Sequence, residues 1–205
     1  TMGDSAAIYE SLVNLYHGAP YNNINNAGRY YPGAIKHFQA TKEKYKEGVV
    51  SSVYAIFLES KNEYNEAQRY FLKAYDLFDQ LDSVMAKATA CNSIGNNYAR
   101  INSLEASTKY HKQAVEIASK IHYNKCIASA LMNIGINFRR SNPDSAMHYY
   151  RASLSQITPK GMERFKVKLT YNMANLYLDQ NKLDSAEAIF NQVLAYSKEA
   201  KFYEG

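Results

Sequence analysis

Small and bulky apolar residues recur along the chain with a period of 39 or 40 residues. A small residue is followed three positions later by a bulky one in four segments: Ala55 and Leu58, Gly95 and Tyr98, Gly135 and Phe138, and Ala174 and Tyr177. Each segment then has a second small residue and, four positions later, a ring: Ala67 and Phe71, Ser107 and His111, Ala146 and Tyr150, and Ala186 and Phe190. A fixed period of this length is typical of a solenoid, in which each unit stacks on its neighbours.

The apolar positions of each period form two helical stripes separated by a turn. In the second segment, one stripe runs from Ala88 to Tyr98 and the other from Leu104 to Ala118, both with steps of three and four residues. An asparagine stands between the stripes in all four segments, at Asn62, Asn102, Asn142 and Asn181. Asparagine tolerates the left-handed conformation that ends helices. We therefore predict that each repeat is a helix, a tight turn at this asparagine and a second helix.

These positions resemble the tetratricopeptide repeat, over about residues 47–200, and the fourth segment matches the family pattern best. The resemblance implies an all-α fold, a right-handed α-solenoid of antiparallel helix pairs. The family's usual period is about 34 residues, and we assign the extra residues here to a longer second helix in each repeat. Such long repeats resemble those of bacterial regulatory proteins, where they often precede a signalling domain.

The resemblance also divides the chain. We expect four repeats at about 47–83, 84–122, 123–160 and 161–200, and the start of a further one before residue 205. Residues 1–46 are expected to form a degenerate repeat or cap, with a first helix near 5–16, a loop at about 18–30, and a second helix around Ala34–Ala40. We expect either a longer array cut within a repeat or an abbreviated cap.

Composition and charge exclude little. The 24 basic and 19 acidic residues give a formal net charge of +5, which we interpret as a solubility feature, with a preference for an acidic ligand as the alternative. The two cysteines, Cys91 and Cys126, lie in apolar stripes. They predict small buried side chains rather than a disulfide or a metal site.

Motifs for nucleotide binding, metal-dependent hydrolysis or nucleophilic catalysis do not occur. We therefore expect a protein that is not an enzyme, with no catalytic residue, no metal and no cofactor. The arginines are too few for a nucleic-acid-binding stripe, and no apolar run approaches the ~18–20 residues of a membrane span. By this segment we expect neither nucleic-acid nor membrane binding, but a protein or peptide partner.

In the family that the chain resembles, the first helices of successive repeats line a concave face. Carried over position by position, the resemblance implies a binding face made of Asn92, Asn96, Arg100, Met132, Asn133, Ile136, Arg139, Arg140, Lys168, Tyr171, Asn172 and Asn175. Asparagine amides pair with a peptide backbone whatever its side chains, and arginines bind carboxylates by forked hydrogen bonds. A solvated polar face without a ligand is the alternative.

The sequence thus predicts a non-catalytic scaffold that binds an extended peptide or a partner helix, as the sensor or interaction part of a larger bacterial regulator. The alternative is self-assembly into a homo-oligomer through an exposed terminal repeat, at Ile189, Val193 and Tyr196. We expect a cytoplasmic protein, or the periplasmic portion of a membrane-anchored regulator. The identity of the partner does not follow from the sequence.

Overall fold

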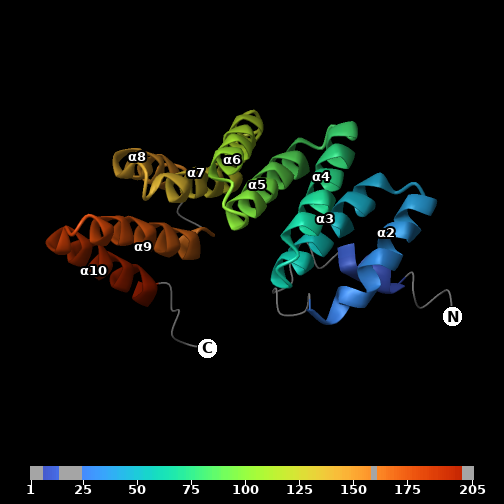
Figure 1. Ribbon diagram of the computed structural model, residues 1–205, viewed down its shortest axis with the longest axis horizontal. Helices are drawn as coiled ribbons and strands as arrows, with labels where there is room; N and C mark the ends of the chain where they lie inside the picture. The colour runs from blue at the N-terminus through green and yellow to red at the C-terminus, as the bar shows by residue number, and fades with distance from the viewer. Residues whose placement is uncertain (1–6, 14–24, 158–160, 200–205) are drawn as a thin grey trace. The chain divides into compact units, whose positions relative to one another are not determined.

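The structure, a computed structural model, describes residues 7–13, 25–157 and 161–199, and every regular element in these ranges is helical (Figure 1). A short helical segment at 7–13 precedes the labelled elements. These are η2 (Asn25–Tyr30), α2 (Tyr31–Ala40), α3 (Lys44–Ser60), α4 (Tyr64–Gln80), α5 (Val84–Arg100), α6 (Leu104–Ser119), α7 (Asn124–Phe138), α8 (Pro143–Leu154), α9 (Glu163–Asp179) and α10 (Leu183–Glu199). The predicted all-α architecture is confirmed. None of the described helices is long and apolar enough to cross a membrane.

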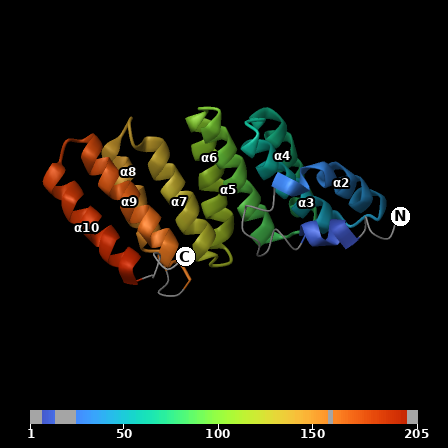
Figure 2. The same ribbon diagram turned by 90° about the horizontal axis from the view of Figure 1, so that it is seen from below.

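The chain divides into two compact units, Thr1–Ser103 and Leu104–Gly205. In the first unit α3 packs on α4, and α4 on α5. In the second unit each helix from α6 to α10 packs on the next one in the chain, and Figure 2 shows α7 to α10 as a row of neighbouring helices. Tight turns reverse the chain between α3 and α4, between α7 and α8, and between α9 and α10, which makes these packed pairs antiparallel, as the repeat pattern predicts.

Residues in the left-handed conformation end the helices at regular intervals. Five of them stand 20 positions apart, namely Lys42, Asn62, Asp82, Asn102 and His122, with φ between 50° and 63°. At the first predicted turn, the Glu63 N–H donates to the Leu58 carbonyl and the Asn62 N–H to the Glu59 carbonyl, each at 3.0 Å. These two hydrogen bonds satisfy carbonyls at the end of the helix that have no partner within the helix. The predicted role is confirmed for Asn62, Asn102 and Asn181, whose φ is 57°.

Asn142 is the exception, and the prediction of a left-handed turn residue was wrong there. Its φ is −150°, and its side-chain oxygen accepts a 2.9 Å hydrogen bond from the Ser145 N–H. It is therefore the N-cap of α8, with Pro143 in the first turn. The third repeat is one residue shorter between its helices, so the chain enters α8 directly from this asparagine.

The extra length of the repeats is shared between the two helices of a pair. The first helix α3 and the second helix α4 both have 17 residues, while α5 has 17 and α6 has 16. Assigning the extra residues to the second helix alone was therefore wrong. The length of the sequence period does not say in which helix the extra residues lie, because one additional turn fits equally well in either.

The small residues of the repeat pattern lie where two helices meet closely. A Cβ at Gly135 would lie 2.5 Å from Cε1 of Tyr150 and 3.1 Å from the Ala146 backbone oxygen. Tyr150 fills the ring position of the third repeat and is fully buried, and His111, which fills it in the second, is 1% exposed. The alternation of small and ring positions therefore follows from the packing of the first helix against the second helix within a repeat.

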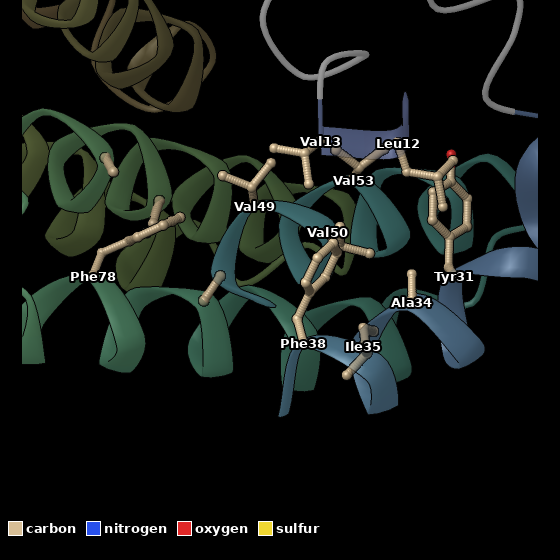
Figure 3. Close-up of a cluster of buried hydrophobic side chains, with 13 residues drawn as sticks. Leu12, Val13, Tyr31, Ala34, Ile35, Phe38, Val49, Val50, Val53 and Phe78 are labelled. Carbon is tan, nitrogen blue, oxygen red and sulfur yellow. The ribbon is translucent and has the colours of Figure 1, made fainter. Parts of the chain in front are cut away.

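At the start of the chain, helical segment 7–13 and α2 pack in one buried cluster with α3. Figure 3 shows Leu12 and Val13 beside Val49 and Val53 of α3, within a buried cluster that also contains Phe38 of α2. Part of the loop expected at 18–30 is instead the short helix η2, and the rest of that loop, at 18–24, lies outside the described residues. The ends of the helix expected at 5–16 also lie outside them.

Candidate functional site

The candidate residues lie on, or directly after, the first helices of three repeats. Asn92, Asn96 and Arg100 are in α5, which belongs to the first unit. The remaining nine belong to the second unit: Met132, Asn133, Ile136, Arg139 and Arg140 in or just after α7, and Lys168, Tyr171, Asn172 and Asn175 in α9. Each group is therefore a candidate surface of its own unit.

In the first unit, the α5 asparagines already have partners. Asn92 is half-buried and Asn96 exposed, and both take part in interactions within the chain. Arg100 acts on Glu59 of α3. Burial raises the pKa of Glu59 to about 7, and the positive charge of Arg100 opposes that rise. The Glu59 Oε1 atom has no hydrogen-bond partner in the described part of the chain. This surface is thus largely bonded within the protein itself.

In the second unit, α9 presents a stripe of exposed or half-buried side chains at steps of three and four residues. Along it lie Lys168, Tyr171, Asn175 and Leu178, of which Tyr171 is 50% and Leu178 is 42% exposed. The Tyr171 ring contacts Phe190 of α10 edge-on, with 5.8 Å between the ring centroids. This contact fixes the tyrosine against its own helix pair while one side stays open to solvent.

The corresponding stripe of α7 is more mixed. Ile136 is 42% exposed and Arg140 is exposed, whereas Asn133 is half-buried and takes part in an interaction within the chain. Met132 is only 2% exposed and packs in a cluster with Tyr150 and other apolar residues of the second unit. Met132, which the resemblance placed on the binding face, therefore has its side chain in the core instead.

One candidate on α9 has an unused donor. The Nδ2 atom of Asn172 is buried and has no hydrogen-bond partner among the described residues. An unpaired amide donor is costly when it is shielded from water. Asn172 is therefore the candidate amide with the strongest reason to take an acceptor from outside.

Arg139 is committed to an ion pair within the protein. Its Nε donates to Oδ2 of Asp179 at 2.5 Å, and its Nη2 donates to Oδ1 at 2.9 Å. These hydrogen bonds raise the pKa of Arg139 and lower the pKa of the Asp179 carboxyl. The forked pair joins the carboxyl ends of α7 and α9. Arg139, predicted as a ligand for an external carboxylate, thus already binds an internal one.

A pocket of about 620 Å³ lies around this ion pair, and all its lining residues belong to the second unit. They are Leu104, Ile136, Asn137, Arg139, Arg140, Pro143, Asp179 and Gln180. Two arginines and one aspartate leave this lining with one excess positive charge. Three candidate residues, Ile136, Arg139 and Arg140, therefore meet in one depression.

Sequence reasoning missed the partner of Arg139 and two buried asparagines. The signal for the ion pair was present, because Arg139 and Asp179 lie 40 positions apart at adjacent sites of the repeat. Asn137 donates from Nδ2 to the hydroxyls of Ser107 and Thr108. Asn97 donates to the Tyr64 carbonyl and the Gln68 side chain. Both amides hold neighbouring helices together.

In the described ranges, no group of three or more His, Cys, Asp or Glu residues is placed to hold a metal ion. Neither cysteine forms a disulfide within the described ranges, and both are buried. Burial raises the pKa of the Cys126 thiol to about 11, which keeps it in the unreactive protonated form.

Comparison with known proteins gives one family match, within a single helix pair. Residues 167–199, in α9 and α10, match the family model of the tetratricopeptide repeat. Comparison with curated protein sequences gives no match. Among solved structures, BtubC (BKLC) from P. vanneervenii has a TM-score of 0.76 at 14% identity, with 99% of this chain and 92% of that chain covered.

Two further solved structures are similar over part of their length. Aspartyl phosphate phosphatase F from Bacillus subtilis has a TM-score of 0.82 at 12% identity, with 97% of this chain and 52% of that chain covered. The Rap conjugation gene regulator of the plasmid pLS20, in complex with the Phr* peptide, has a TM-score of 0.72 at 16% identity, with 88% and 50% covered. This chain thus spans about half the length of both proteins. At these identities the likeness shows the fold alone.

Proposed function

We propose that this chain, whose helices have the tetratricopeptide-repeat fold, is a non-catalytic scaffold that binds an extended peptide or a partner helix. The binding surface is the face of α7 and α9 in the second unit. The observation that carries the proposal is the exposure of Ile136, Tyr171 and Leu178 on these two first helices. Apolar side chains gathered on one face favour a partner over a purely solvated surface.

The polar residues of this face have the chemistry that a peptide backbone requires. Asn172 has an unpaired amide donor, and Asn175 lies one turn further along α9. Each amide group supplies both donors and an acceptor, so it can pair with backbone groups independently of the peptide sequence. Apolar side chains beside such amides add affinity and select among peptides.

The solved relatives support the same class of function. The Rap regulator of plasmid pLS20 was solved with a bound peptide, Phr*, and another Rap protein with competence and sporulation factor. These proteins share the repeat fold with this chain. We therefore propose that the chain is the sensor or interaction part of a larger bacterial regulator.

A peptide-binding measurement tests the proposal. Wild-type protein is titrated with a positional-scanning library of fluorescein-labelled hexapeptides, and binding is followed by fluorescence polarisation. The double variant Ile136→Ser with Leu178→Ser should weaken binding by about tenfold or more, since apolar contacts of two side chains are lost. The matched control, Leu183→Ser with Leu194→Ser, changes two exposed leucines on α10 and should bind as wild type does. Equal binding by both double variants, or no binding to any pool, refutes the proposed face.

Self-assembly remains the second candidate, because α10 carries exposed apolar side chains. Leu183 is 61% and Leu194 is 45% exposed. The three residues predicted for this role, Ile189, Val193 and Tyr196, are only half-exposed, and the Lys166 ammonium lies 3.7 Å from the centroid of the Tyr196 ring. The surface to test is therefore the leucine pair.

Sedimentation velocity over a hundredfold concentration range distinguishes this candidate. If α10 mediates self-association, the wild-type protein forms dimers or larger species with increasing concentration, and the Leu183→Ser, Leu194→Ser variant shifts towards monomer. A wild-type protein that is monomeric at every concentration excludes it.

A further inference from the structure

We infer that the pocket at the carboxyl ends of α7 and α9 binds one carboxylate of the peptide ligand, through Arg140, beside an apolar side chain. The inference rests on the proposed function and specifies the chemistry that the second unit selects. The carboxylate belongs either to the carboxyl terminus of the peptide or to an aspartate or glutamate side chain.

The charges of the pocket single out Arg140. Asp179 takes both forked hydrogen bonds from Arg139 and so neutralises that guanidinium. Arg140 is exposed, and in the described part of the chain it forms no hydrogen bond or ion pair. Its charge contributes to the lowered pKa of the Asp179 carboxyl, which places it near the ion pair without a carboxylate of its own. Arg140 is thus the lining cation with full capacity for an external anion.

The apolar walls determine what stands next to the carboxylate. Ile136 from α7 and Leu104 from the start of α6 are each 42% exposed where they line the pocket, and Pro143 lies beside them. A volume of about 620 Å³ falls within the usual range for ligand pockets, about 300–1,000 Å³. The site therefore suits a carboxylate with an apolar side chain next to it.

Asp179 limits the pocket to a single carboxylate. A second anion near Arg139 would meet the Asp179 carboxylate at close range, and like charges in a partly desolvated site repel strongly. Replacing Asp179 with asparagine frees the Arg139 guanidinium and raises the excess positive charge of the lining from one to two. The two neighbouring charges thus have opposite effects on acidic ligands.

Pools of the hexapeptide library test this site. Three forms are compared: pools with a free carboxyl terminus, amidated pools with aspartate or glutamate fixed at one position, and amidated pools with asparagine or glutamine there. Wild-type protein should bind at least one acidic form about tenfold more tightly than the neutral form, and added salt should reduce this preference. The acidic form that is preferred identifies the source of the carboxylate.

Variants then assign the preference to the pocket. Arg140→Gln should abolish it by lowering the affinity for the acidic pools to that for the neutral pools, whereas Asp179→Asn should increase it severalfold. Arg151→Gln, at an exposed arginine of α8, is the matched control and should keep the wild-type preference. Thermal unfolding of each variant confirms that the fold is retained.

The outcomes separate this inference from the function on which it rests. Binding to all pools without an acidic preference, or a preference that survives Arg140→Gln, overturns the carboxylate site and leaves the peptide-binding face intact. A preference lost equally in Arg151→Gln also overturns it, because a general charge effect would then explain the data. Failure to bind any pool removes both proposals.

Discussion

Asn137 of α7 donates hydrogen bonds from Nδ2 to the hydroxyl of Ser107, at 2.8 Å, and to that of Thr108, at 3.0 Å, both in α6. Forty positions earlier, Asn97 of α5 donates in the same way to the Tyr64 carbonyl of α4, at 3.0 Å. The asparagine-rich first helices therefore contain two kinds of residue. Those at this position join a first helix to the second helix of the preceding repeat, and those on the open face are the binding candidates.

Asn137→Ala should destabilise the protein by about 1–3 kcal/mol, because the buried Ser107 hydroxyl and the half-buried Thr108 hydroxyl of α6 lose their donor. The free energy of unfolding is measured by urea titration. Asn191→Ala, at an exposed position of α10, is the matched control and should change stability by no more than about 0.5 kcal/mol. Equal effects of the two substitutions would falsify the structural role of Asn137.

The two kinds of turn asparagine should respond differently to serine. Serine caps a helix about as well as asparagine, so Asn142→Ser should alter the free energy of unfolding by less than about 0.5 kcal/mol. Serine tolerates the left-handed conformation poorly, so Asn181→Ser should destabilise by about 1 kcal/mol. Chemical denaturation of both variants measures the difference, and a larger loss at Asn142 would contradict the assignment.

Gly135→Ala should destabilise by about 1–3 kcal/mol through overpacking, because the new methyl group would be forced against the Tyr150 ring and the Ala146 backbone. Tyr150→Phe keeps that ring and removes a buried hydroxyl that has no hydrogen-bond partner in the described ranges. It should therefore leave stability unchanged or raise it. Thermal unfolding measures both effects, and a large loss in Tyr150→Phe would show that the hydroxyl is bonded after all.

Acid should destabilise the protein through His111. Burial lowers the pKa of His111 from 6.5 to about 4, so the unfolded state binds a proton more readily than the folded state. The stability that comes from keeping this ring neutral is present above about pH 6.5 and is lost as the pH falls towards 4. His111→Phe retains a ring at this position and should move acid unfolding, followed by circular dichroism, to lower pH. The exposed His148 provides the control His148→Phe, which should not.

Glu59 should give the opposite pH dependence. Its pKa is raised from 4.5 to about 7 by burial, so the folded state holds the proton more tightly than the unfolded state. The contribution to stability is fully present below about pH 4.5 and is lost as the pH rises through 7. Glu59→Gln should remain neutral and should therefore stabilise the protein at pH 8 relative to wild type. Melting temperatures at both ends of this window measure it, and Glu187→Gln on the surface of α10 should show no such gain.

The sequence predicted the helix pairs well because the same requirement recurs in each copy. The same residue types therefore recur at equivalent positions of the copies. Examples are the left-handed turn residues Asn62, Asn102 and Asn181, and the small residue Gly135, which faces a ring. Asn142 broke the pattern because a deletion of one residue changes the backbone at a turn while the residue type stays the same. Local chemistry that is not repeated is hard to recognise by comparing copies.

The candidate site was less predictable because it depends on what each side chain meets. The repeat register places Met132 on a first helix but does not say that Tyr150 and its neighbours bury it. Likewise, it makes Arg139 a potential ligand for anions, although Asp179 occupies its guanidinium. These contacts form between residues of different helices. The position of a single residue in the repeat does not reveal which residue of another helix it will contact.

The left-handed residues at 20-residue intervals, from Lys42 to His122, also bear on how rapidly the chain folds. Because the chain reverses at each of them, helices that pack together within a unit are mostly consecutive in sequence. Contacts of short sequence separation require little loop closure before they form, so helical proteins of low contact order fold on the order of microseconds to milliseconds. Each helix can add to its predecessor without waiting for distant parts of the chain, and folding can begin at more than one repeat.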